Sequence, residues 1–101
     1  MTMENASERF FNGGTPLQTI TPALGALWWA AKGSWDHAHR LVQNEDSDDA
    51  SWVHAHLHRI EGDLINANYW YWKAGRTASG ESLEIERVSI AAELLRCAAV
   101  D

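Results

Sequence analysis

Helical periodicity, interrupted by glycines, is the feature that most restricts what this chain can fold into. Apolar residues recur every three or four positions from residue 22 to residue 98, and they do not alternate with period two over any length. Gly33, Gly62 and Gly75 each stand where such a pattern stops, as expected of glycines that end helices in a left-handed conformation. The sequence therefore predicts an all-α fold of about five helices.

Capping residues place the helix boundaries. Thr21-Pro22 pairs a capping hydroxyl with a proline in the first turn, and Ser34 and Asp63 are small polar residues that follow a terminating glycine. The predicted helices span about residues 22–32, 35–44, 48–61, 64–74 and 81–98. In the last helix we expect one apolar stripe to face the core, and Cys97 to be a buried free thiol. The stripe consists of Leu83, Val88, Ala91, Ala92, Leu95 and Ala98.

One domain fits a chain of 101 residues. Residues 1–20 are polar and rich in turn-forming residues towards their end, so we interpret them as a mobile arm on which Phe10 and Phe11 can dock. Residues 21–101 are predicted to form a single helical domain. The six tryptophans are an unusual number for this length, and we expect them to supply much of its core.

The charge of the chain excludes some classes of partner. The net charge is −6 and the eight basic residues are scattered, which disfavours binding to nucleic acid. The most apolar stretch, residues 23–31, is too short to span a bilayer. The N-terminus lacks the apolar core of a secretory signal. We therefore expect a cytoplasmic protein that binds neither nucleic acid nor membrane.

Two segments share one pattern, residues 33–38 (GSWDHA) and residues 62–67 (GDLINA). In each, a glycine ends a helix, a small polar residue caps the next helix, a large apolar residue follows, and an alanine comes three positions later. A tight turn between antiparallel helices needs glycine for its backbone and a small residue at the closest approach. The pattern therefore predicts two antiparallel helical hairpins, with the last helix as a cap.

This pattern resembles the turn and second helix of tetratricopeptide repeats over about residues 22–75. The second copy carries the family's spacing at Gly62, Leu64, Ala67, Tyr71 and Ala74, and residues 69–74 (YWYWKA) are similar to the second helix of Sel-like repeats. The glycines lie closer together than the usual period, and no proline closes either repeat. Residues 51–71 also resemble a group of small uncharacterised bacterial proteins, which implies no function.

The resemblance to tetratricopeptide repeats implies a protein-interaction module. Stacked helical hairpins form grooves that hold peptides or helices, so the expected partner is another protein or a second copy of the chain. The sequence has no nucleophile motif, phosphate-binding loop or dinucleotide fingerprint. We therefore lean against an enzyme and expect no cofactor under this interpretation.

A row of polar residues on the third helix supports an alternative function. His54, His58 and Glu61 are spaced i, i+4 and i+7, so they share one face, and two histidines with one glutamate can hold a divalent metal with an open position. The metalloprotease pattern HExxH is absent because Ala55 follows His54. The same residues also fit a structural pair, since a glutamate near a helix C-terminus favours a partner such as His58.

Three further residues extend this candidate site. His39 follows Trp35 by one turn and can approach the row if the second and third helices are neighbours. Arg59 and Tyr69 complete the expected binding residues. The alternative is therefore a small-molecule or metal-binding protein, including an enzyme in which His58 serves as an acid or base.

Overall fold

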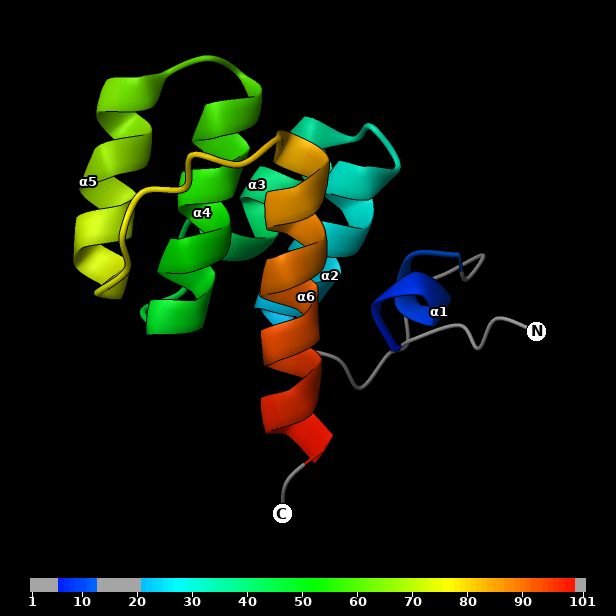
Figure 1. The fold of residues 1–101 in the computed structure, drawn as a ribbon. Helices are drawn as coiled ribbons and strands as arrows, with labels where there is room; N and C mark the ends of the chain where they lie inside the picture. The colour runs from blue at the N-terminus through cyan, green and yellow to red at the C-terminus, as the bar shows by residue number, and fades with distance from the viewer. Residues whose placement is uncertain (1–5, 13–20, 100–101) are drawn as a thin grey trace.

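The computed structural model describes residues 6–12 and 21–99, and in these residues it is helical with no strand (Figure 1). The described residues form six helices: α1 (Ala6–Asn12), α2 (Pro22–Ala31), α3 (Trp35–Val42), α4 (Asp48–Ile60), α5 (Leu64–Ala74) and α6 (Leu83–Ala99). The all-α prediction is confirmed, and α2 to α6 correspond to the five predicted helices. The additional helix, α1, lies within the segment that we interpreted as an arm.

Two of the three predicted caps form. The hydroxyl of Thr21 accepts a hydrogen bond from the backbone N–H of Leu24, and the Asp63 carboxylate caps α5. The Ser47 hydroxyl caps α4 in the same way. Ser34 occupies the corresponding position before α3, but its side chain makes no capping hydrogen bond.

The two predicted turns have one geometry. Gly33 and Gly62 have φ angles of +87° and +82°, which a residue with a side chain rarely adopts. After each glycine the next backbone N–H bonds a carbonyl five residues back, Ser34 to Trp29 at 3.0 Å and Asp63 to His58 at 2.9 Å. The turns join α2 to α3 and α4 to α5, and the helices of each pair pack closely together.

α4 lies at the centre of the domain, between α5 on one side and α2 and α6 on the other (Figure 1). The main core fills the space among α2, α3, α4 and α6, and its largest fully buried apolar side chains are Leu27, Leu57 and Ile90. A smaller cluster between α4 and α5 contains Ala55, Ala67 and Tyr71. Because α4 is covered on several sides, its polar side chains are forced into contact with other helices.

Several expectations about burial are wrong. Of the six tryptophans, all in the described part of the chain, only Trp28 is buried, and the main core is built mainly from alanine and aliphatic side chains. Leu64, which carries the repeat spacing together with Ala67 and Tyr71, is exposed, whereas those two residues are buried. Cys97 is exposed because the C-terminal part of α6 extends past the other helices (Figure 1).

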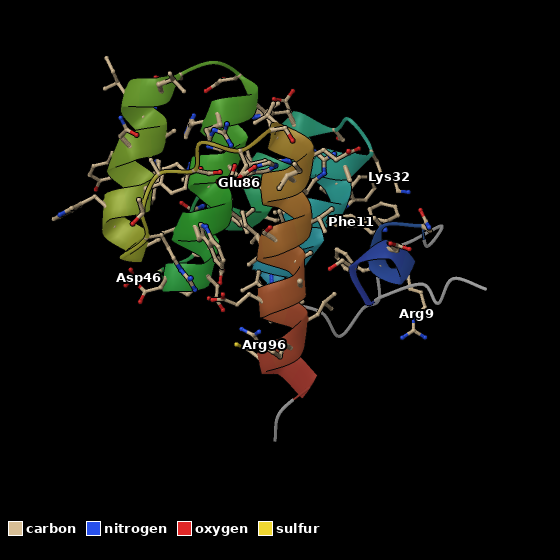
Figure 2. The ribbon with its side chains drawn as sticks, in the orientation of Figure 1. Arg9, Phe11, Lys32, Asp46, Glu86 and Arg96 are labelled. Atoms are coloured by element: carbon tan, nitrogen blue, oxygen red, sulfur yellow. The ribbon has the colours of Figure 1, made fainter. Side chains whose placement is uncertain are left out.

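The N-terminal segment is partly described. Phe10 and Phe11 of α1 pack against the main core, as their apolar character predicts. The ammonium of Lys32 donates a 2.7 Å hydrogen bond to the carbonyl of Phe11, at the contact between α1 and α2 (Figure 2). Residues 1–5 and 13–20 of the predicted arm lie outside the described residues. Among the described helices, none is long and apolar enough to cross a membrane.

Candidate metal centre

Three histidines alternate along α4, at positions 54, 56 and 58. Successive residues of an α-helix are rotated by about 100°, so His54 and His58 share one face while His56 points to the other. The structure has a polar cluster on each face. We call His39, His54 and His58 the three-histidine cluster, and the residues on the other face the Glu86 network. The Glu86 network consists of His56, Arg59, Tyr71 and Glu86.

The three-histidine cluster brings together imidazole rings from α3 and α4. The Nε2 atoms of His39 and His54 are 3.0 Å apart, so one of them donates a hydrogen bond to the other. The rings of His54 and His58 stack, with centroids 4.9 Å apart. Each of the three residues offers one ring nitrogen, and these nitrogens all lie within 4.8 Å of one another.

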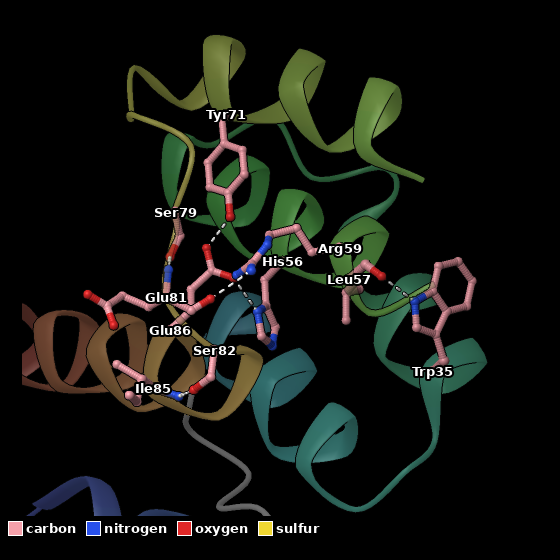
Figure 3. Close-up of polar contacts among 10 residues, drawn as sticks. All are labelled: Trp35, His56, Leu57, Arg59, Tyr71, Ser79, Glu81, Ser82, Ile85 and Glu86. Carbon is pink, nitrogen blue, oxygen red and sulfur yellow. Dashed lines mark hydrogen bonds and ion pairs between the residues drawn. The ribbon is translucent and has the colours of Figure 1, made fainter. Parts of the chain in front are cut away.

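Tryptophans hold the rings in place. Trp35 stacks on His39 with ring centroids 4.7 Å apart, and its indole N–H donates a 2.7 Å hydrogen bond to the carbonyl of Leu57 (Figure 3). Trp70 of α5 stacks on His54 at 3.8 Å. His54 is only 3% exposed, His58 is also buried, and His39 is partly exposed. The cluster therefore has a fixed inner wall and one edge that solvent reaches.

Glu61 orients His58. Its carboxylate oxygen lies 2.6 Å from Nδ1 of His58, and since an ionised carboxylate only accepts, Nδ1 carries the proton. The lone pair of His58 is then on Nε2, the tautomer that metal-ligating histidines adopt when a carboxylate supports them. Glu61 also forms a second close group with His58 and Asp63, but both of its acidic members are at least partly open to solvent.

Two residues of the three-histidine cluster, His39 and His54, favour the neutral imidazole. Burial, followed by the nearby charges of His39, His58 and Lys73, lowers the pKa of His54 to about 3. Burial also lowers the pKa of His39. Within the described part of the chain, Nδ1 of His54 is buried without a hydrogen-bond partner. A buried polar atom of this kind costs about 1 to 3 kcal/mol, and Nε2 of His56 on the other face of α4 is in the same position.

The spacing of the cluster is close to that of a metal site. Two nitrogens bound to a tetrahedral zinc ion at 2.0–2.1 Å are about 3.3 Å apart. The observed 3.0 Å between His39 and His54 is near this value. Since all three nitrogens lie within 4.8 Å of one another, closing the set on one ion requires a movement of about 1.5 Å or less.

The Glu86 network is chemically different, because a carboxylate occupies its centre (Figure 3). One oxygen of Glu86 is 2.7 Å from Nδ1 of His56 and accepts a 2.7 Å hydrogen bond from Arg59, while the other accepts from the Tyr71 hydroxyl. Arg59 also donates to the carbonyl of Glu81 at 2.7 Å. These contacts join α4, α5 and α6 at one point.

The ionised form of Glu86 is strongly favoured. Burial alone raises its pKa, but hydrogen bonds from His56, Tyr71 and Arg59 outweigh this effect and hold the pKa below its ordinary value. Burial and the contact with Glu86 raise the pKa of Tyr71, which stays a donor. An open pocket of about 500 Å³, lined in part by Trp52 and by Glu86 itself, lies beside the network. Because both of its oxygens are hydrogen-bonded, Glu86 has a structural role here and holds α6 to α4 and α5.

The predicted site residues separate between these two clusters. His39, His54 and His58 converge, and Glu61 contacts the group through His58. Arg59 does not join them, because it points to Glu86 on the other side of α4. Tyr69 does not join them either; it is half exposed on the outer side of α5. The close set of possible ligands is therefore three histidines, rather than His54, His58 and Glu61.

Sequence reasoning missed four residues that matter here. His56 and Glu86 are 30 positions apart, so no local spacing links them. Trp35 and Trp70 were expected only as core residues, whereas both stack on histidines of the cluster. The sequence held a signal for each: Trp35 lies one turn before His39, and Trp70 lies on the helix that packs against α4.

Comparisons with known proteins do not place this chain in a family. No protein-family model matches it, and no curated protein or solved structure is similar to it at a significant level. The likeness to tetratricopeptide and Sel-like repeats therefore stays a prediction, and a functional proposal depends on the geometry of the site.

Proposed function

We propose that this protein binds one divalent transition-metal ion through His39, His54 and His58. The observation that carries the proposal is the convergence of three ring nitrogens, from two helices, within 4.8 Å of one another. Histidines with a structural role usually satisfy their nitrogens with carboxylates, carbonyls or water. Here two imidazoles instead contact each other, and a third stacks alongside.

The donor set selects the class of metal. Imidazole nitrogen suits zinc, copper, nickel and iron, whereas calcium and magnesium require oxygen ligands. Three protein ligands with a fourth position left to water or another small ligand are typical of zinc sites that do chemistry. Zinc is thus the best fit, and the partly exposed side of His39 is the route by which an ion and a fourth ligand reach the site.

The surroundings of the cluster favour binding in two ways. The ligands must be neutral to coordinate, and the low pKa values of His39 and His54 keep them so at neutral pH. The contacts from Trp35, Trp70 and Glu61 also restrict ring rotation before the ion arrives. Fixing a ligand in advance lowers the entropy cost of binding.

The direct test is isothermal titration of zinc into chelator-treated protein. We expect one ion per chain in the wild type and loss of that binding in His39→Ala. His39 is the best residue to change because it is the least buried of the three, so the fold should survive its removal. His37→Ala is the matched control, since His37 lies on the same helix and stacks on Trp29 outside the cluster.

The outcomes separate clearly. Binding that is lost in His39→Ala and kept in His37→Ala supports the three-histidine site. Equal binding in both variants assigns the ion to another part of the surface, and no binding of zinc, nickel or copper by the wild type overturns the proposal. Circular dichroism of each variant confirms that the fold is retained.

A second candidate function, protein interaction, is favoured by a separate observation. α5 exposes large apolar side chains along its outer face, which is typical of surfaces that bind other proteins. This function is compatible with a metal site, because the exposed face lies on the side of α5 away from α4.

A further inference from the structure

The outer face of α5 carries a continuous row that we call the α5 stripe: Leu64, Ile65, Asn68, Tyr69 and Trp72. Positions 65, 68, 69 and 72 follow the i, i+3, i+4, i+7 spacing of one helical face. Ile65 is 87% exposed and Trp72 is 76% exposed, and Leu64 and Tyr69 are at least half exposed. The rings of Tyr69 and Trp72 lie 6.1 Å apart, so the aromatic part of the stripe is contiguous.

α5 is apolar on two opposite faces. Its inner face, Ala67, Tyr71 and Ala74, is buried. Among the described helices it packs closely only against α4, and it lies at the edge of the molecule (Figure 1). A helix that is apolar on both sides is normally covered on both sides. The α5 stripe therefore has the composition of a contact surface without a contact inside the described chain.

We infer that the α5 stripe binds a second copy of this chain, with the two α5 helices antiparallel about a twofold axis. An isologous interface must be complementary to itself. Ile65 and Trp72 lie at equal distances from the midpoint between Asn68 and Tyr69, so antiparallel pairing places Ile65 of each copy opposite Trp72 of the other. The two large, most exposed side chains thus cover each other.

Charge complementarity favours the same arrangement. The chain has a net charge of −6, which opposes self-association at most surfaces, but α5 contains no acidic residue and one basic residue, Lys73. Asp63 caps the opposite end of the helix. Antiparallel pairing brings Lys73 of one copy to the end of α5 that carries Asp63 in the other, and twofold symmetry repeats the pair.

The available area fits a modest dimer. The four exposed apolar side chains of the stripe present on the order of 500 Å², which is below the roughly 800 Å² per partner of a standard interface. We therefore expect a dimer that dissociates on dilution rather than an obligate one.

The test is sedimentation equilibrium of the full chain over a range of concentrations, in buffer with a chelator so that metal plays no part. We expect a monomer–dimer equilibrium in the wild type. Trp72→Ala should raise the dissociation constant by about 30-fold or more, because buried tryptophans dominate interface energies. Ile85→Ala is the matched control: Ile85 is a half-exposed apolar residue on α6, outside the stripe, and its removal should leave the equilibrium unchanged.

Chemical cross-linking tests the orientation. In a Cys97→Ser background, Asn68→Cys places a thiol beside the proposed axis, and a short bismaleimide should link two copies. Thr77→Cys, beyond the end of α5, should not be linked. A monomer at all concentrations overturns the inference and leaves a different protein as the occupant of the stripe. A dimer unaffected by Trp72→Ala, or linked equally well at position 77, also overturns it.

Discussion

The two faces of α4 use the same residue type for different purposes. On one face, His56 contacts Glu86, which also forms an ion pair with Arg59 and accepts a hydrogen bond from Tyr71. On the other face, His39, His54 and His58 contact one another, and Glu61, the carboxylate that bonds His58, lies at the edge of the group. Both clusters are largely buried, so burial alone does not distinguish a structural histidine from a ligand. The position of the carboxylate does.

The two clusters differ in the bonds that their histidines already make without a metal ion. In the Glu86 network the carboxylate already holds His56, Arg59 and Tyr71, although Nε2 of His56 has no hydrogen-bond partner among the described residues. A metal ion entering this network would have to displace existing ion pairs. In the three-histidine cluster the Nε2 atoms of His39 and His54 contact only each other, so an ion bound between them would use lone pairs that no carboxylate occupies. The Glu86 network is accordingly expected to control stability, and the three-histidine cluster to control metal affinity.

The largest effect is expected from Glu86→Gln. Arg59 is partly buried, and this change removes its anionic partner. Breaking a buried ion pair from one side costs about 3 to 5 kcal/mol. Urea unfolding measures the loss. Glu93→Gln is the control on the same helix, where a partly exposed pair with Arg76 should contribute less than about 1 kcal/mol. Similar losses in the two variants would remove the special role of the Glu86 network.

A smaller effect is expected from Glu61→Gln on zinc affinity. The amide no longer fixes the His58 tautomer, and the loss of such a supporting carboxylate lowers metal affinity by about 10- to 100-fold. Calorimetry measures the change, with unfolding in the absence of metal as the check on stability. If the affinity is unchanged, Glu61 is only a helix-end partner of His58 and does not support a ligand.

The smallest effect is expected in the pH dependence of stability. The pKa of Glu86 is below its ordinary value of 4.5 in the folded chain, so its contribution to stability is complete above pH 4.5 and is lost as the pH falls through the lower folded value. The difference in unfolding free energy between wild type and Glu86→Gln should therefore shrink on acidification. If the difference in unfolding free energy grows towards low pH, the pKa of Glu86 is raised in the folded chain and not lowered.

Local features of this fold were predictable from sequence. The glycines that end α2, α4 and α5 act through their own backbone conformation, so Gly33 and Gly62 are identified without knowledge of the tertiary structure. The spacing of His54 and His58 likewise fixes their shared face. The approach of His39 needed only the assumption that α3 and α4 are neighbours, which the structure bears out.

Features that depend on partners distant in sequence were not predictable in the same way. We placed Val88 and Ala92 on the inward face of α6, treating the charged residues as solvent-facing. The structure rotates this face so that Glu86 and Ile90 are buried and Val88 is exposed. A buried glutamate is tolerated only because three donors from α4 and α5 meet it, and those donors become visible only once the helices are assembled.

Binding of a metal ion by the three-histidine cluster is tested most directly by the NMR spectrum of the five histidine side chains, recorded with ¹⁵N labelling during a zinc titration. Ring nitrogens that bind a metal change their chemical shifts and tautomers directly. We predict that one equivalent of zinc shifts the ring nitrogens of His39, His54 and His58 and leaves those of His37 and His56 unchanged. Shifts at His56, or shifts confined to His37, would contradict it.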